Sequence, residues 1–288
     1  MPSSTEELLE LLDLETIDVN LFRGIQPDTL LQRVFGGQVA AQALVAGART
    51  VAEPLAVHSL HSYFLRPGDT AVPIVYDVER IRDGRTFSTR RIVARQHGHG
   101  IYFMTASFQV PESGFEHQDV MPAVTSPEES ADMGELFRRR SPGNADEWLR
   151  EWAALELRYV GDSRAGGNIP SDERPSQSRF WIRVSGKLNG DPLLHQAAFT
   201  YASDMTLLGS ALVPHGLHVS HPKLQSASLD HTIWFHRPFR VDEWLLYDQV
   251  SPSASGGRGL ALGRVFTQDG TLVASVAQEG LIRLREGS

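Results

Sequence analysis

The chain has 288 residues, which suggests about two domains at roughly 150 residues each. Apolar residues make up 41% and charged residues 22%, so collagen-like, coiled-coil and wholly disordered proteins are poor matches. The 27 basic and 35 acidic residues give a net charge of −8, which argues against a protein that coats nucleic acid or an anionic membrane.

The chain has no cysteine, which excludes disulfides, thiolate nucleophiles, iron–sulfur clusters and cysteine-ligated zinc. No apolar run approaches the roughly 18 residues of a membrane-spanning helix. Residues 1–10 lack the basic and then apolar order of a secretory signal, and residues 285–288 are not a peroxisomal address. We therefore expect a cytoplasmic protein.

The first elements predicted along the chain are two helices and a group of strands. Ser3 and Glu6 have capping-box spacing before a leucine-rich stretch, which predicts a short leading helix. Residues 38–48 are small and apolar, which predicts a helix that is buried on most sides and needs a wrapping partner. Residues rich in β-branched and aromatic side chains follow and predict an antiparallel meander, with strands at 58–65, 73–81, 86–96 and 101–110.

The same unit recurs later in the chain. Residues 64–67 (FLRP) match residues 235–238 (FHRP) at an offset of 171, and a Tyr-Asp pair at 76 recurs at 247 with the same offset. A second long helix is expected at 192–213, before the second set of strands. Several matches in one order indicate a duplicated unit. We expect an N-terminal unit with its leading helix at 1–112, a connector at 113–177 and a C-terminal unit at 178–288.

The connector is rich in Pro, Ser, Glu and Arg and carries little strand pattern. Within it, residues 144–157 have the spacing of a short amphipathic helix, with Trp148, Trp152 and Leu155 on one stripe.

Common catalytic motifs are missing from the sequence. There is no Gly-x-Ser-x-Gly elbow, Walker loop, Gly-x-Gly-x-x-Gly fingerprint or His-Glu-x-x-His pair. Nucleotide hydrolases, Rossmann enzymes and zinc proteases of that type therefore lose their main support.

Asp204 is the strongest candidate for chemistry. It falls between Tyr201 and Leu208 in the apolar stripe of the second long helix. Burial of a carboxylate costs several kcal/mol unless the carboxylate is hydrogen-bonded. Burial also alters the pKa of the carboxylate, and an altered pKa is typical of a general base. A structural aspartate that caps a kink fits this pattern equally well.

Two polar residues of the second meander are weaker candidates. Gln278 shares one strand face with three apolar residues, so its amide points toward the core. Taken alone, a satisfied core amide is the favoured interpretation. Ser228 precedes the strand at 229–235 and by itself is most simply a turn residue.

Five stretches of the chain form a recognisable set: 34–38 (VFGGQ), 58–68 (HSLHSYFLRPG), 201–204 (YASD), 229–238 (LDHTIWFHRP) and 276–280 (VAQEG). This set resembles the acyl-CoA thioesterase II family, and the likeness runs from about Leu21 to Arg283. The resemblance implies an α+β double hotdog, with two tandem units that each wrap an antiparallel sheet around a long helix. It also implies that Asp204, Ser228 and Gln278 together activate water for attack on a thioester. Bacterial members often have Thr at the position of Ser228, which keeps the hydroxyl.

The implied reaction is hydrolysis of fatty acyl-CoA to a fatty acid and coenzyme A, with no metal or redox cofactor. Coenzyme A is then part of the substrate, and its phosphates are expected near Arg85, Arg90 or Arg258. Hotdog units commonly pair, so we expect a homodimer or homotetramer, with no nucleic-acid partner and no membrane span. Two alternatives remain open: a hotdog acyl-CoA hydratase or dehydratase that uses His58 or His61, and a non-catalytic acyl-CoA-binding module.

The repeat also predicts asymmetry between the halves. Ser59 pairs with Ser228 in the repeat, and Gln109 lies near the position of Gln278. When Phe35 is matched with Tyr201, Gln38 falls opposite Asp204. An amide cannot accept a proton from water, so we expect one working site per chain.

Overall fold

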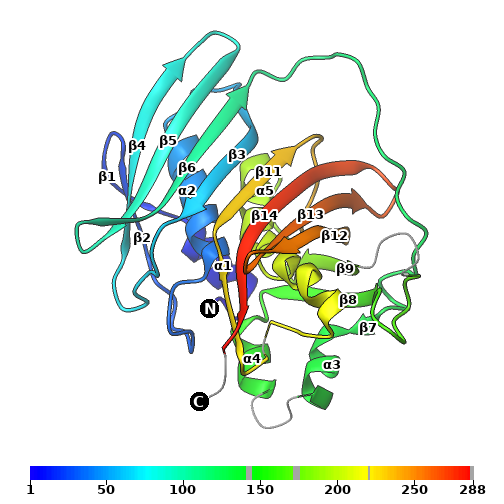
Figure 1. Cartoon of the computed structure of the whole chain (residues 1–288). Coiled ribbons are helices and arrows are strands. Elements are labelled where there is room, and N and C mark those ends of the chain that lie inside the picture. The colour runs from blue at the N-terminus through cyan, green and yellow to red at the C-terminus, as the bar shows by residue number, and fades with distance from the viewer. Residues whose placement is uncertain (141–144, 171–175, 220, 286–288) are drawn as a thin grey trace.

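The computed structural model describes residues 1–140, 145–170, 176–219 and 221–285. Within them, fourteen strands form a single antiparallel sheet (Figure 1). The strand order is β1-β2-β4-β5-β6-β3-β11-β14-β13-β12-β9-β8-β7, and β10 pairs with β14 outside this path. The first six strands in this order come from the first half of the chain.

The N-terminal unit contains two helices and six strands. Its leading helix is capped by Ser4, whose hydroxyl accepts from the Glu7 N–H, so the expected cap at Ser3 with Glu6 is wrong by one residue. The elements are α1 Thr5–Leu12, β1 Glu15–Asp18, β2 Leu21–Gly24, α2 Gly36–Ala48, β3 Ala56–Phe64, β4 Ile74–Asp83, β5 Phe87–Gln96 and β6 His99–Gln109.

The rest of the described residues add eight strands and three α-helices, together with one 3₁₀ helix, η1. These elements are β7 Ala131–Asp132, α3 Met133–Arg140, α4 Ala145–Glu151, β8 Leu155–Asp162, β9 Gln177–Val184, α5 Pro192–Ser203, η1 Leu207–His215, β10 Leu224–Ser228, β11 Asp230–Phe235, β12 Leu245–Ser255, β13 Arg258–Thr267 and β14 Leu272–Leu284. Within the described residues, no helix is long and apolar enough to cross a membrane.

The structure confirms the duplication. The starts of β4 and β12, at Ile74 and Leu245, are separated by the offset of 171 that the sequence repeat shows, and so are those of β5 and β13. The two halves join through β3 and β11, where Leu60 faces Ile233 in antiparallel register. The fold is therefore the expected α+β double hotdog.

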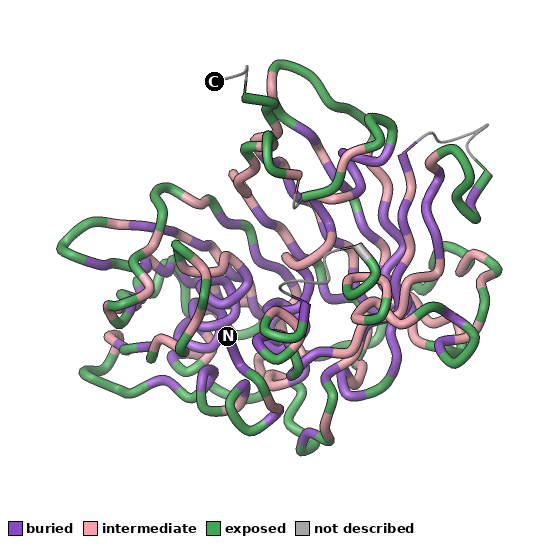
Figure 2. Tube along the Cα trace, turned by 90° about the horizontal axis from the view of Figure 1, so that it is seen from below, coloured by how far each residue is buried: buried purple, intermediate pink, exposed green. Residues whose placement is uncertain are grey.

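The helices α2 and α5 pack against each other inside the curved sheet (Figure 1). All residues of α2 between Gly37 and Gly47 are buried, and most of them are small, which lets the sheet approach the helix closely. Figure 2 shows buried positions gathered inside the molecule and recurring along the strands. The alternation on the strands places one face of the sheet against the helices.

The connector contributes strands to the sheet, contrary to expectation. β8 pairs with β9, with Leu155 opposite Val184, and β7 pairs with β8. The predicted helix at 144–157 ends at Glu151, and Asn144 lies outside the described residues. Apolar and charged side chains alternate over residues 155–158, and Tyr159 and Val160 follow. This segment favours a strand once β9 offers a partner. The division at 1–112, 113–177 and 178–288 stays a prediction.

Candidate active site

Asp204 lies at the C-terminal end of α5, where the helix breaks. Its backbone torsions are φ −80° and ψ −7°, and the chain then turns into η1. The expected continuous helix at 192–213 is therefore wrong. The segment after the break contains Gly209 and Pro214, both of which disfavour a continuing α-helix. The break aims the carboxylate of Asp204 at β10 and β14 instead of along the helix.

Three predicted site residues meet at this point. Gln278 Nε2 donates to Asp204 Oδ1 at 2.5 Å, and the Ser228 hydroxyl donates to the same oxygen at 3.2 Å. Gln278 Nε2 also lies 2.8 Å from Ser228 Oγ. Strand pairing explains the meeting, because Ser228 on β10 faces Gly280 on β14, two residues beyond Gln278.

The first half of the chain supplies the other wall of the site. A Cβ atom on Gly36 would lie 2.6 Å from Asp204 Oδ2, and one on Gly37 would lie 2.2 Å from the Tyr201 carbonyl oxygen. Only glycine permits this approach, so the first turn of α2 lies directly against Asp204. The Gly37 N–H donates to the Asp204 carboxylate.

The role of Gly36 and Gly37 was not predicted from the sequence. In the sequence they are part of the VFGGQ stretch that resembles the family. The feature that could have indicated their role is a pair of glycines at the start of a buried helix. A helix start brings unpaired N–H groups and a partial positive charge to the site.

Burial raises the pKa of Asp204 to about 6, while the hydrogen bonds from Gln278, Ser228 and the Gly37 N–H limit the rise. A carboxylate in this range is mostly ionised at neutral pH but is more basic than an exposed one. Gln278 is fully buried, and its Oε1 has no hydrogen-bond partner within the described residues. Gln278 thus turns its donor nitrogen toward Asp204 and Ser228, and the Asp204 carboxylate provides an acceptor for a bound water molecule.

The corresponding polar groups of the first half are not brought together. Gln38 Nε2 donates to Gln26 Oε1 at 2.9 Å, whereas Gln109 Nε2 donates to Glu112 Oε1 at 2.8 Å. Ser59 is buried within β3. Each of these amides is thus held by a partner of its own.

The predicted equivalence of Gln38 and Asp204 is wrong. Gln38 is in the first turn of α2, whereas Asp204 is the residue that ends α5. The residue that ends α2 is Arg49, which donates to the Leu14 carbonyl and pairs with Asp13. The first half therefore has a cation where the second half has its carboxylate.

The two histidines of the hydratase alternative have other partners. His58 Nε2 lies 2.8 Å from Ser107 Oγ, and the His61 ring contacts the Trp234 ring at 5.3 Å between centroids. His61 is exposed. Both histidines of β3 are thus in contact with side chains of neighbouring strands.

Of the three arginines expected near the coenzyme A phosphates, Arg90 is ruled out. Its side chain is 1% exposed and donates to Thr50 Oγ1 at 2.7 Å and to the Thr50 carbonyl at 3.0 Å. The sequence pattern that indicates its burial is the alternation along β5, which places Arg90 on the same face as Ile92, two residues later. Arg258 pairs with Glu279 at 3.0 Å, and Arg85 is exposed in the turn between β4 and β5.

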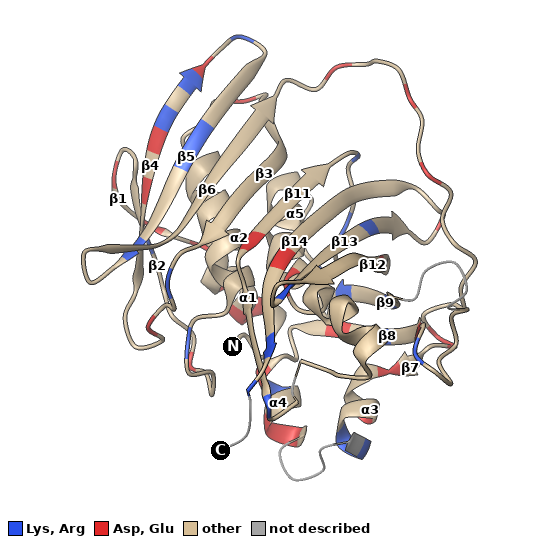
Figure 3. Ribbon diagram, in the orientation of Figure 1, with Lys and Arg blue, Asp and Glu red and all other residues tan. Residues whose placement is uncertain are grey.

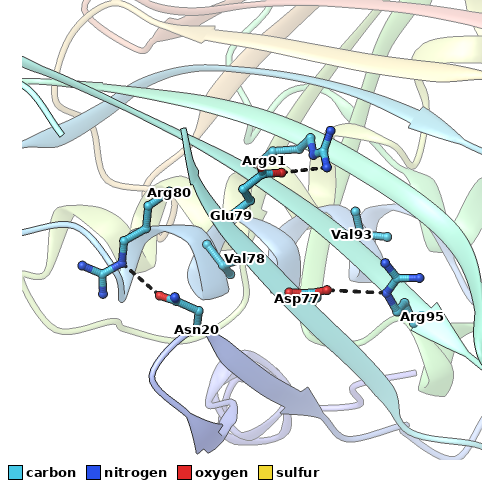
Figure 4. A pocket seen from close by; sticks show the side chains of 8 residues that line it. All are labelled: Asn20, Asp77, Val78, Glu79, Arg80, Arg91, Val93 and Arg95. Carbon is cyan, nitrogen blue, oxygen red and sulfur yellow. Dashed lines mark hydrogen bonds and ion pairs between the residues drawn. The ribbon is translucent and has the colours of Figure 1, made fainter. Parts of the chain in front are cut away.

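A charged hollow on the outer surface of β4 and β5 is a separate feature (Figure 4). Figure 3 shows positive and negative positions along these two strands. Ion pairs cross the two strands there, between Glu79 and Arg91 at 2.7 Å and between Asp77 and Arg95 at 3.7 Å. Because opposite charges face each other, we interpret the charged side chains that line the hollow as cross-strand ion pairs on the surface.

Comparison with known proteins agrees with the fold. The family model for acyl-CoA thioesterase matches residues 166–281, and the model for the acyl-CoA thioesterase N-terminal domain matches residues 26–109. Acyl-CoA thioesterase 2 of Haemophilus influenzae is 40% identical over 99% of this chain and 100% of its own length. Human acyl-coenzyme A thioesterase 8 is 41% identical over 95% of this chain and 88% of its own length.

A solved structure is similar over nearly the whole chain. The acyl-CoA thioesterase II TesB2 of Mycobacterium marinum superposes with a TM-score of 0.82 at 48% identity, and the match covers 97% of this chain and 99% of that one. The similarity to the Haemophilus influenzae and Mycobacterium marinum proteins therefore extends over both halves and the connector. The chain belongs to the acyl-CoA thioesterase II family.

Proposed function

We propose that this protein hydrolyses fatty acyl-CoA thioesters to a fatty acid and coenzyme A, with Asp204 as the general base. Membership of the family supports thioester hydrolysis. The observation that carries the assignment of Asp204 is its partly buried carboxylate, held by Gln278, Ser228 and the Gly37 N–H. A carboxylate with raised pKa and three donors is placed to take a proton from water.

In the proposed reaction, water attacks the thioester carbonyl carbon while Asp204 accepts one of its protons. The carbonyl electron pair moves to oxygen, and a tetrahedral intermediate forms. When this intermediate collapses, the carbon–sulfur bond breaks and the thiolate of coenzyme A takes the proton back from Asp204. Ser228 and Gln278 hold the carboxylate and the water in position, which lowers the entropy cost of the attack.

The start of α2 is suited to the negative charge that develops on the thioester oxygen. Phe35, at the N-terminal cap, provides no side-chain acceptor for the first N–H groups of the helix. These groups and the positive end of the helix dipole lie against Asp204, as the close approach of Gly36 shows. Such fixed donors stabilise an oxyanion without reorganisation.

We also propose that the protein associates with further copies of itself through the outer face of its sheet. Tyr63 is 53% exposed and stacks on Phe103, and Trp234 is 38% exposed on the neighbouring strand β11. Exposed aromatic side chains of this kind suit an interface. Sedimentation should show species heavier than the 31.9 kDa chain, and a monomer alone at working concentration would contradict this proposal.

The activity is tested by release of free thiol from a series of acyl-CoA esters. Asp204→Asn should lower kcat by about 10²–10⁴-fold, the usual contribution of a general base. Asp191→Asn is the matched control, because it makes the same change at the other end of α5, where asparagine also caps a helix. If the wild type releases no thiol from any ester, or if both variants lose activity equally, the proposal is wrong.

A further inference from the structure

A second cavity, of about 730 Å³, lies where the connector meets the C-terminal unit. Its walls come from α3, α4, β8, β9 and η1. Its volume falls within the range of about 300–1,000 Å³ that is typical of small-molecule sites. Most of the lining is apolar and aromatic, including Trp148, Trp152, Leu155, Phe180, Val213 and Leu217.

The cavity lies next to the candidate active site. Met205 and Thr206, which line it, directly follow Asp204 in the chain. Trp152, in the opposite wall, packs edge-on against Phe35 with ring centroids 5.0 Å apart. Phe35 precedes the glycines of α2 that lie against the carboxylate of Asp204. The apolar lining therefore begins one residue from Asp204 along the chain, and its opposite wall touches the residue before Gly36.

We propose that this cavity binds the acyl chain of the substrate and that the connector thereby sets the preference for long chains. The inference rests on the proposed function, because it assigns a place to the acyl half of an acyl-CoA thioester. α3, α4 and β8 all lie within the connector, so the segment between the two hotdog units forms most of the chain-binding wall.

The charges of the lining favour the acyl chain over the coenzyme A phosphates as the occupant. The lining contains three carboxylates, Asp132, Glu156 and Asp162, and one arginine, Arg164. Arg164 Nε donates to Asp162 Oδ2 at 2.7 Å, so its charge is already compensated. Phosphates need unpaired cations, whereas a hydrocarbon chain needs only apolar contact.

Gly209 offers a direct test, because it lines the cavity and has room for a side chain. A Cβ atom there would meet only Val219 Cγ1, at 3.9 Å, and Val219 is itself part of the lining. Gly209→Ala, Gly209→Leu and Gly209→Phe should therefore fill the cavity progressively. Gly190→Leu is the control, because a Cβ at that exposed position meets nothing within 4 Å and Gly190 lies outside the lining.

The readout is kcat/KM for butanoyl-CoA and palmitoyl-CoA, with circular dichroism to check folding. Each methylene that loses its place in the cavity should cost about fourfold. We expect Gly209→Leu to lower kcat/KM for palmitoyl-CoA by at least about tenfold, with less than about twofold change for butanoyl-CoA. Gly209→Ala should fall between wild type and Gly209→Leu, which keeps the test valid if Gly209→Phe does not fold. The control should match the wild type for both esters.

The two ways in which the test can fail are distinguishable. In the first, the wild type hydrolyses both esters, and the Gly209 variants either lower both rates equally or change neither rate. The cavity then does not hold the acyl chain, while the proposed function still stands. If the wild type hydrolyses neither ester, the proposed function itself fails.

Discussion

Replacing Asp204 with asparagine should stabilise the folded protein in a pH-dependent way while it removes activity. The reason is that burial raises the pKa of Asp204 from 3.8 to about 6, so the ionised form is disfavoured in the folded state. Below about pH 3.8 the group is protonated in both states and contributes nothing to the difference. As pH rises toward 6, the wild type loses stability relative to the variant, and above 6 the deficit stays constant.

The magnitude follows from the shift of about two pKa units. At 1.36 kcal/mol per unit, ionised Asp204 costs the folded state about 3 kcal/mol at pH 8. At pH 4.5 most of this cost is absent, because the folded state keeps the proton. The free energy of unfolding of Asp204→Asn minus that of the wild type should therefore be about 2 kcal/mol larger at pH 8 than at pH 4.5.

Urea denaturation of both proteins at the two pH values measures this difference. The amide introduced at position 204 would face some of the donors that now bind the carboxylate, but that penalty does not change with pH and cancels in the comparison. Asp191→Asn, at the exposed N-terminal cap of α5, tests whether any such replacement gives the same trend. A difference that is the same at pH 4.5 and pH 8 would refute the raised pKa, and with it the argument for Asp204 as a tuned base.

Further outcomes are expected from activity measurements. The kcat/KM of the wild type should rise with pH through about 6 and level off above it, because Asp204 must be ionised to accept a proton. Gln278→Leu removes a hydrogen bond that lowers the pKa of Asp204, so the midpoint should move upward as kcat falls; an unmoved midpoint would count against the contact. Gln38→Ala should keep most of the activity, because Gln38 is bonded to Gln26, and a loss equal to that of Asp204→Asn would mean that both halves share the chemistry. Activity should survive a chelator, since carboxylate, hydroxyl and amide supply the proposed steps, and irreversible loss would contradict this mechanism.

The sequence by itself predicts a duplicated unit of a helix followed by strands, four of the six strands of the first half, and the place of Asp204 in an apolar helix stripe. Each of these depends on local composition, on periodicity or on a repeat, whereas the double hotdog is what the family resemblance implies. A high content of β-branched and aromatic residues identifies β4 and β5, and the offset of 171 carries the same pattern to β12 and β13. Asp204 stands out because the surrounding stripe is apolar, and the structure places it against α2, β10 and β14. The catalytic roles of Asp204, Ser228 and Gln278 remain predictions.

Only the tertiary structure decides which residues meet. Asp204 and Gln278 are 74 residues apart, and their contact depends on strand register and on the break after α5. The approach of Gly36 to Asp204 crosses between the two halves, where no local pattern extends. The connector shows the same limit, since β8 becomes a strand because β9 offers a hydrogen-bonding edge. Local propensities select elements along the chain, whereas contacts between distant elements depend on how the whole sheet packs around its helices.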